Sequence, residues 1–263
     1  MEIALARNAE DAAAQVADVI LARLKAKPDL VLGLATGSTP IGVYRRLRDA
    51  HARGEVSFAR VRTFNLDEYL DLPADHPQSY RTFMREHLFQ GLDLPPENVH
   101  FPPTEGRDLL RRCEEYEARI VECGGIDVQL LGIGRNGHIG FNEPTSSLAS
   151  RTRVKTLTER TLEDNARFYG PGERPPVLAV TMGIGTILDA REVLLQAIGP
   201  KKAQAVRSMV EGPVSSFFPA SALQLHRRVT AYLDPEAASL LTMIAYYRRT
   251  RAQDEELRRA GRL

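Results

Sequence analysis

Short apolar runs alternate with helical patterns along almost the whole chain. Runs rich in valine, leucine and isoleucine predict buried strands at residues 30–35, 61–64, 127–133, 177–181, 192–198 and 229–233. Apolar residues at three- and four-residue spacing predict helices at residues 11–25, 40–52, 79–89, 107–123, 184–190, 200–210 and 235–259. This alternation predicts an α/β fold, in which a mostly parallel sheet carries helices on both faces.

The length and the even spacing of these elements indicate how the chain is organised. A chain of 263 residues fits one α/β domain, and we expect a single domain over residues 1–263 that ends in a helix at 235–259. Ligands of such folds bind at the carboxyl ends of the strands. Polar residues that directly follow a predicted strand are therefore the first candidates for function.

Composition narrows the classes of partner. The net charge of +1 gives no long-range reason to expect nucleic acid or an acidic membrane surface. The first residues lack a signal peptide, and no apolar run reaches transmembrane length. Cys113 and Cys123 lie in one helical pattern roughly 15 Å apart, too far for a disulfide, so we expect free thiols in a cytoplasmic protein.

The stretch GIGRNGHIGFNEP (132–144) contains the G-x-G-x-x-G spacing of a dinucleotide fingerprint. A fingerprint needs a helix after the glycines and an acidic residue about twenty positions on, whereas here Pro144 follows soon and the twentieth position is Thr152. The glycines instead bring the backbone close to a ligand beside His138 and Glu143, an imidazole–carboxylate pair suited to acid–base chemistry. No second histidine lies at ligand spacing, so we expect no metal.

Two segments suit an anion. In ATGSTP (35–40), small residues expose backbone N–H groups where a helix begins, although Ser38 or Thr39 could equally be a plain helix cap. In AIGPKKAQAV (197–206), Lys201 and Lys202 lie at the positive end of a helix. Because a cation is unfavourable there, Lys202 is a candidate phosphate ligand, with solvated surface lysines as the alternative.

The stretch TFNLDEYLDLP (63–73) supplies a candidate base. Asp67 follows an apolar strand closely, and partial burial would raise its pKa toward a working pH. A solvated acidic loop is the alternative. Together, the strand ends predict proton transfer on a small phosphorylated substrate.

Several motifs carry a family resemblance. LGLATGSTPIGVYRRL, FNLDEYLDLP, GIGRNGHIGFNEPTSSLASRTR, AVTMGIGTILDA and PASALQLH resemble glucosamine-6-phosphate deaminases from the first strand to about Leu233. The resemblance implies a modified Rossmann-like fold, no cofactor, and conversion of glucosamine 6-phosphate and water to fructose 6-phosphate and ammonium.

The resemblance also implies residue roles. Asp67 would move the C2 proton to C1 of the opened sugar, and His138, with Glu143 as its partner, would open the ring. Asn136 stands where many members have an aspartate, and an amide cannot stabilise an imidazolium as an anion would. The family's substrate-phosphate site maps onto five positions: Gly37, Ser38, Thr39, Arg167 and Lys202.

A second anion site is implied for regulation. Some members are hexamers activated by N-acetylglucosamine 6-phosphate, and others are monomers. The contacts of that activator resemble Ser146, Ser147, Arg153 and Lys155, a set that a solvated basic loop would also explain. Tyr246 or Tyr247 would take the place of the family's tyrosine contact.

Three other functions compete with this interpretation. Galactosamine 6-phosphate differs from the glucosamine substrate by one hydroxyl configuration. A 6-phosphogluconolactonase shares the fold class but needs no C2 base, and its motif resembles GHTASLFP. A sugar-phosphate sensor without catalysis should lose Asp67, His138 and Glu143, which this chain keeps.

Overall fold

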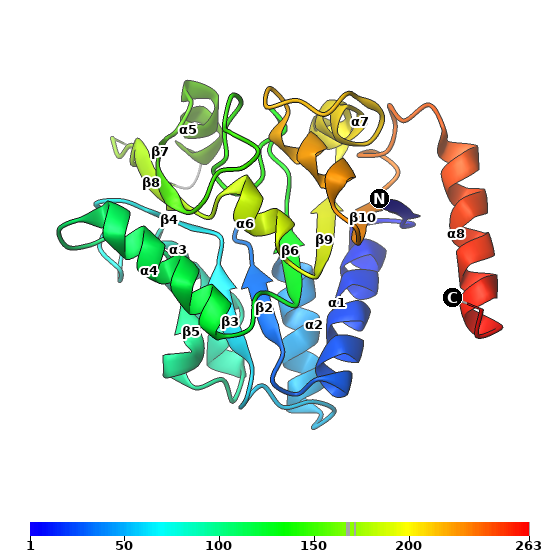
Figure 1. The fold of residues 1–263 in the computed structure, drawn as a ribbon, viewed down its shortest axis with the longest axis horizontal. Helices are drawn as coiled ribbons and strands as arrows, with labels where there is room; N and C mark the ends of the chain where they lie inside the picture. The colour runs from blue at the N-terminus through cyan, green and yellow to red at the C-terminus, as the bar shows by residue number, and fades with distance from the viewer. Residues whose placement is uncertain (167–168, 171, 263) are drawn as a thin grey trace.

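The computed structural model of the chain describes residues 1–166, 169–170 and 172–262, and its centre is a sheet of seven parallel strands (Figure 1). The order across the sheet is β1 (Glu2–Leu5), β10 (Val229–Leu233), β9 (Glu192–Ala197), β6 (Val128–Leu131), β2 (Val31–Leu34), β3 (Arg62–Asn65) and β5 (Val99–His100). Every pair in it is parallel. The predicted α/β class is confirmed, whereas the edge strands β1 and β5 were not predicted.

Helices cover both faces of this sheet, as the sequence predicts. On one face, α1 (Ala9–Ala26), α2 (Ile41–Ala52) and α3 (Tyr80–His87) pack on the inward side chains of β2, β6 and β9. On the other face lie α4 (Leu109–Glu122), α6 (Ile184–Leu188) and α7 (Ala203–Glu211). In α1, Val16, Ile20 and Leu24 follow the four-residue spacing and are almost completely buried. Cys113 on α4 and Cys123 directly after it are free thiols, as expected.

A second, antiparallel sheet stands beside the carboxyl ends of the parallel strands. It consists of β4 (Asp67–Tyr69), β8 (Leu178–Thr181) and β7 (Arg153–Thr156). The strand predicted at 177–181 exists as β8 but belongs to this sheet. The reason is local: Leu66 still donates its N–H to Leu34 at 3.0 Å, yet its carbonyl accepts from Met182 at 2.6 Å, so the chain changes sheets there.

The C-terminal helix is shorter than predicted. Instead of spanning 235–259, α8 covers Ile244–Arg259. The carboxylate of Asp234 accepts the N–H of Ala237 at 2.8 Å and holds the next residues in turns. A new helix then starts where Glu211 accepts the N–H groups of Thr242 and Met243. Pro235 resembles a helix start, but this long-range cap decides where the helix begins. Likewise, the helix predicted at 200–210 begins as a 3₁₀ turn, Pro200–Lys202, before α7.

Candidate active site

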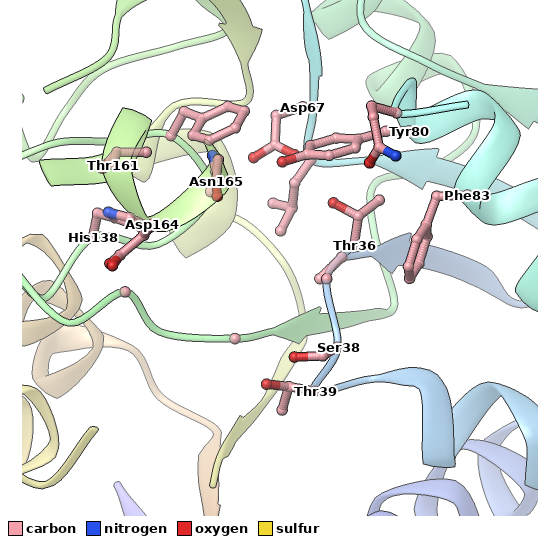
Figure 2. A pocket seen from close by; sticks show the side chains of 18 of the residues that line it. Thr36, Ser38, Thr39, Asp67, Tyr80, Phe83, His138, Thr161, Asp164 and Asn165 are labelled. Atoms are coloured by element: carbon pink, nitrogen blue, oxygen red, sulfur yellow. The ribbon is translucent and has the colours of Figure 1, made fainter. Parts of the chain in front are cut away.

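One cavity of about 530 Å³ lies at the carboxyl ends of β2, β3 and β6, as the fold class predicts (Figure 2). All four predicted strand-end segments line it. From them come Gly37, Ser38, Thr39, Asp67, Gly134, His138, Lys201 and Lys202. The sequence therefore predicts correctly that these segments meet at one site.

The first segment is an uncapped helix start. Gly37 has φ of 99°, and Ser38 and Thr39 follow it before α2. The residue at the cap position is Pro40, and within the described chain no side chain caps this helix. The alternative interpretation of Ser38 or Thr39 as the cap is therefore wrong. Ser38, Thr39 and Ile41 line the cavity at this helix start, where an anion can accept from backbone N–H groups.

Lys202 connects the start of α7 to the glycine-rich segment. Its Nζ donates to the carbonyl of Ile133 at 2.6 Å, and Lys201 lines the same cavity. Both lysines thus lie at the cavity, rather than on a remote solvated surface. Arg167, the remaining predicted phosphate ligand, lies outside the residues that the structure describes.

Asp67 is the buried acid of the cavity. It opens β4, and its residue is only 6% exposed. Burial first, and then the charge of Glu68, raise its pKa to about 8, although an N–H from Phe141 lowers it. Gly140 permits this packing, because a Cβ there would lie 3.3 Å from Oδ2 of Asp67. The predicted burial of this carboxylate is confirmed.

Glu68 has a different role from its neighbour. Its carboxylate accepts the backbone N–H groups of Tyr69, Tyr80 and Arg81 at 2.9, 3.0 and 3.0 Å. Burial still raises its pKa despite these three donors. Glu68 thereby fixes the first turn of α3 against β4, and the sequence alone did not predict this role.

His138 and Glu143 meet across the glycine-rich turn. Nδ1 of His138 lies 3.5 Å from Oε2 of Glu143, which is ion-pair distance, and Glu143 is 1% exposed. Burial opposes ionisation of Glu143, but His138, Thr161 and Asn136 together lower its pKa to about 2. The carboxylate therefore stays ionised over the whole working range of pH.

Asn136 acts on the carboxylate and not on the ring. Its Nδ2 donates to Oε2 of Glu143 at 2.7 Å, and its Oδ1 accepts the backbone N–H of His138 at 3.2 Å. An amide supplies both a donor and an acceptor, whereas an aspartate in the same place could only accept. The asparagine thus suits this geometry as it stands.

Helix α5 (Glu159–Ala166), which the sequence did not predict, borders the cavity. Thr161 donates its hydroxyl to Oε1 of Glu143. Asp164 pairs with Arg135 at 2.8 Å, and Asn165 donates to the hydroxyl of Tyr69 at 2.8 Å. The segment is short and polar, so only its i, i+3, i+4 spacing could have indicated a helix.

The residues predicted for the second anion site lie on two segments, the loop that contains Ser146 and Ser147 and the strand β7. Arg153 and Lys155 point to one side of β7, as their spacing predicts, and Ser146 is buried while Ser147 is exposed. Nη1 of Arg153 donates to Oδ1 of Asn142 at 2.9 Å. Tyr246 and Tyr247 lie on α8, across the molecule from β7, so one chain does not bring them to this site (Figure 1).

Two kinds of feature are absent from the described residues. They contain no group of three or more histidine, cysteine, aspartate or glutamate side chains placed to hold a metal ion. None of their helices is both long enough and apolar enough to cross a membrane.

Comparison with known proteins gives the family. The family model described as glucosamine-6-phosphate isomerases/6-phosphogluconolactonase matches residues 5–232, and the chain belongs to this family. It is 55% identical over 257 residues to a glucosamine-6-phosphate deaminase of Shewanella loihica, which covers 98% of this chain and 96% of the relative. Its identity to one of Hahella chejuensis is 54% over 261 residues, 99% of each chain.

Solved structures agree with this placement. A monomeric glucosamine-6-phosphate deaminase superposes with a TM-score of 0.88 at 46% identity, covering 91% of this chain and 100% of that one. A 6-phosphogluconolactonase from Trypanosoma brucei superposes with a TM-score of 0.74 at 25% identity, covering 92% and 98%.

We predict that Asn136→Asp destabilises the protein in a pH-dependent manner. The change replaces a donor 2.7 Å from Glu143 by a second carboxylate, and like charges raise the pKa of the pair. Ionising such a pair costs folding free energy, so the loss in unfolding free energy should grow from about pH 5 to about pH 8. Urea unfolding at both pH values measures it.

Asn136→Ala is the matched control, because it removes the donor without adding charge. Its loss of stability should be the same at both pH values. Equal, pH-independent losses for the two variants would contradict the assigned contact between Asn136 and Glu143.

Proposed function

We propose that the chain, acting as one catalytic domain, deaminates glucosamine 6-phosphate to fructose 6-phosphate and ammonium in amino-sugar catabolism. One observation carries the proposal: a single cavity is lined by an uncapped helix start, by a buried carboxylate of raised pKa and by His138, which pairs with Glu143. The chain is an enzyme of carbohydrate metabolism, and its family membership restricts the substrate to a sugar phosphate.

The phosphate is held at one end of the cavity. Backbone N–H groups at Gly37, Ser38 and Thr39 donate hydrogen bonds to its oxygens at the start of α2, and Lys202 balances its charge from the start of α7. Arg167 is proposed as a further ligand on the family resemblance. Binding the phosphate there directs the sugar carbons toward Asp67 and His138.

Two proton-transfer groups then act in turn. His138, kept oriented by ionised Glu143, takes the proton of the C1 hydroxyl and returns one to the ring oxygen, which opens the ring. Ionised Asp67 removes the proton from C2 and delivers it to C1. As this proton moves, O1 gains a proton and the amino group loses one, which leaves a hydroxyl at C1 and an imine at C2. Water adds to the imine, the C–N bond breaks, and ammonium leaves.

The competing functions fit the site less well. A lactonase needs no base at C2, so it would not explain why Asp67 is buried with a pKa of about 8. A sensor without catalysis would not need the pair of His138 and Glu143. The galactosamine epimer would use the same groups, and comparing the two substrates directly distinguishes them.

We further propose a cytoplasmic homohexamer in which N-acetylglucosamine 6-phosphate binds at Ser146, Ser147, Arg153 and Lys155. Arg153 and Lys155 offer two cations on one side of β7, and Asn142 links Arg153 to the carbonyl of Ile139, next to His138. The monomeric deaminase of similar structure supports the alternative of a monomer.

We predict that Asp67→Asn abolishes ammonium release, by at least about 100-fold, because the base is lost. In the unchanged enzyme, kcat/KM should rise as the pH approaches about 8, where Asp67 ionises. The folded state holds this proton more tightly than the unfolded state, so its burial costs stability increasingly between pH 3.8 and about 8.

The same variant should therefore gain stability relative to the unchanged protein as the pH rises through that window. Ammonium assays and denaturant unfolding across the window measure both effects. Residual release near the original rate would rule out Asp67 as the base.

The regulatory proposal makes a separate prediction. We expect the mass of six chains by light scattering, sigmoidal kinetics that N-acetylglucosamine 6-phosphate makes hyperbolic, and loss of this activation in Lys155→Gln, which removes one of the two cations. A monomer with hyperbolic kinetics that the acetylated sugar leaves unchanged would contradict it.

A further inference from the structure

Helix α5 touches three separate parts of the active-site wall with one face. Thr161, Asp164 and Asn165 follow the i, i+3, i+4 spacing that places side chains on the same side of a helix. They contact Glu143, Arg135 and Tyr69, respectively. Figure 2 shows all three helix residues beside the cavity that Asp67 and His138 also border.

The contact of Thr161 is the one that reaches the acid–base pair. Oε2 of Glu143 is shared by His138 and Asn136, both from the glycine-rich turn. Oε1 accepts the hydroxyl of Thr161, and the backbone N–H of Thr158 is 3.5 Å away. The two oxygens are thus held from two different segments, so the plane of the carboxylate depends on both.

The direction of the Thr161 hydroxyl is also fixed. Thr158 donates its own hydroxyl to Oγ1 of Thr161 at 3.2 Å. Because the ionised carboxylate can only accept, the proton of the Thr161 hydroxyl points to Glu143. Thr161 is 3% exposed, and the carboxylate that it meets is 1% exposed. A hydrogen bond to a buried ionised group is among the stronger ones in proteins.

We propose that Thr161 is a positioning residue, whose hydroxyl orients Glu143 so that this carboxylate faces the ring of His138. Without the hydroxyl, Oε1 of Glu143 loses the nearer of its two donors, and the carboxylate can rotate away from the ring of His138. The proposal deepens the deaminase function above and rests on it. It predicts that Thr161 supports ring opening without contributing to the binding of the phosphate.

Two pairs of variants isolate the hydroxyl. Thr161→Val keeps the shape and removes the hydroxyl, and Thr161→Ser keeps the hydroxyl. Comparing Thr161→Ala with Thr161→Ser repeats the test with smaller side chains. The test therefore remains possible if the valine variant does not fold. Thr186→Val is the matched control: Thr186 is also buried and donates to a carboxylate, that of Glu117, at 2.6 Å, but does not line the cavity.

The measurements are ammonium release from glucosamine 6-phosphate and the affinity for the reduced open-chain amino-alditol 6-phosphate, which binds without ring opening. We expect kcat to fall about tenfold or more in the valine and alanine variants, because one hydrogen bond to a charged group is lost. KM and the affinity for the alditol should stay within about twofold, and Thr161→Ser and Thr186→Val should keep kcat within about threefold.

Each contrary result has a distinct meaning. Equal losses of kcat and of alditol affinity would show a general structural role and overturn the proposal. A valine variant with the activity of the unchanged enzyme would also overturn it. A loss in Thr161→Ser equal to that in Thr161→Ala would do the same. If the unchanged protein releases no ammonium, the deaminase function itself fails, and the positioning role fails with it.

Discussion

The active site depends on the burial of one carboxyl group, that of Asp67, at the junction of two sheets. The chain leaves the parallel sheet after Asn65, and Leu66 bonds to both sheets through Leu34 and Met182. Asp67 therefore emerges at the carboxyl ends of the parallel strands with little access to water. Its raised pKa is a consequence of this position. Three backbone N–H groups donate to Glu68 and hold the junction in place. None of these three groups donates to Asp67.

The carboxylate of Glu143 shows the opposite shift in pKa. Glu143 is as deeply buried as Asp67, yet its pKa falls because His138 first, and then Thr161 and Asn136, favour the ionised form. Two buried carboxylates of the site, Asp67 and Glu143, thus differ in ionisation because Glu143 has an ion-pair partner and hydrogen-bond donors around it and Asp67 has few. A difference of this kind separates a group that exchanges a proton from a group that stays charged and orients its partner.

Much of this arrangement could be predicted from the sequence. The alternation of apolar runs and helical patterns gives the parallel sheet, and the strand-end rule brings Asp67, His138 and the ATGSTP segment to one site. Helix ends were less predictable, since α8 begins where Glu211, distant in sequence, caps it. The antiparallel sheet and α5 were missed because short polar segments owe their structure to tertiary contacts, such as that between Thr161 and Glu143.

Isotope labelling tests directly whether Asp67 carries the proton from C2 to C1. Substrate carrying deuterium at C2 is converted in ordinary water, and the fructose 6-phosphate formed is analysed by mass spectrometry and NMR. If buried Asp67 both removes and returns the proton, part of the deuterium should appear at C1 of the product, because the carboxylate is shielded from exchange with solvent. Product without any deuterium at C1, with no isotope effect on the rate, would contradict the account.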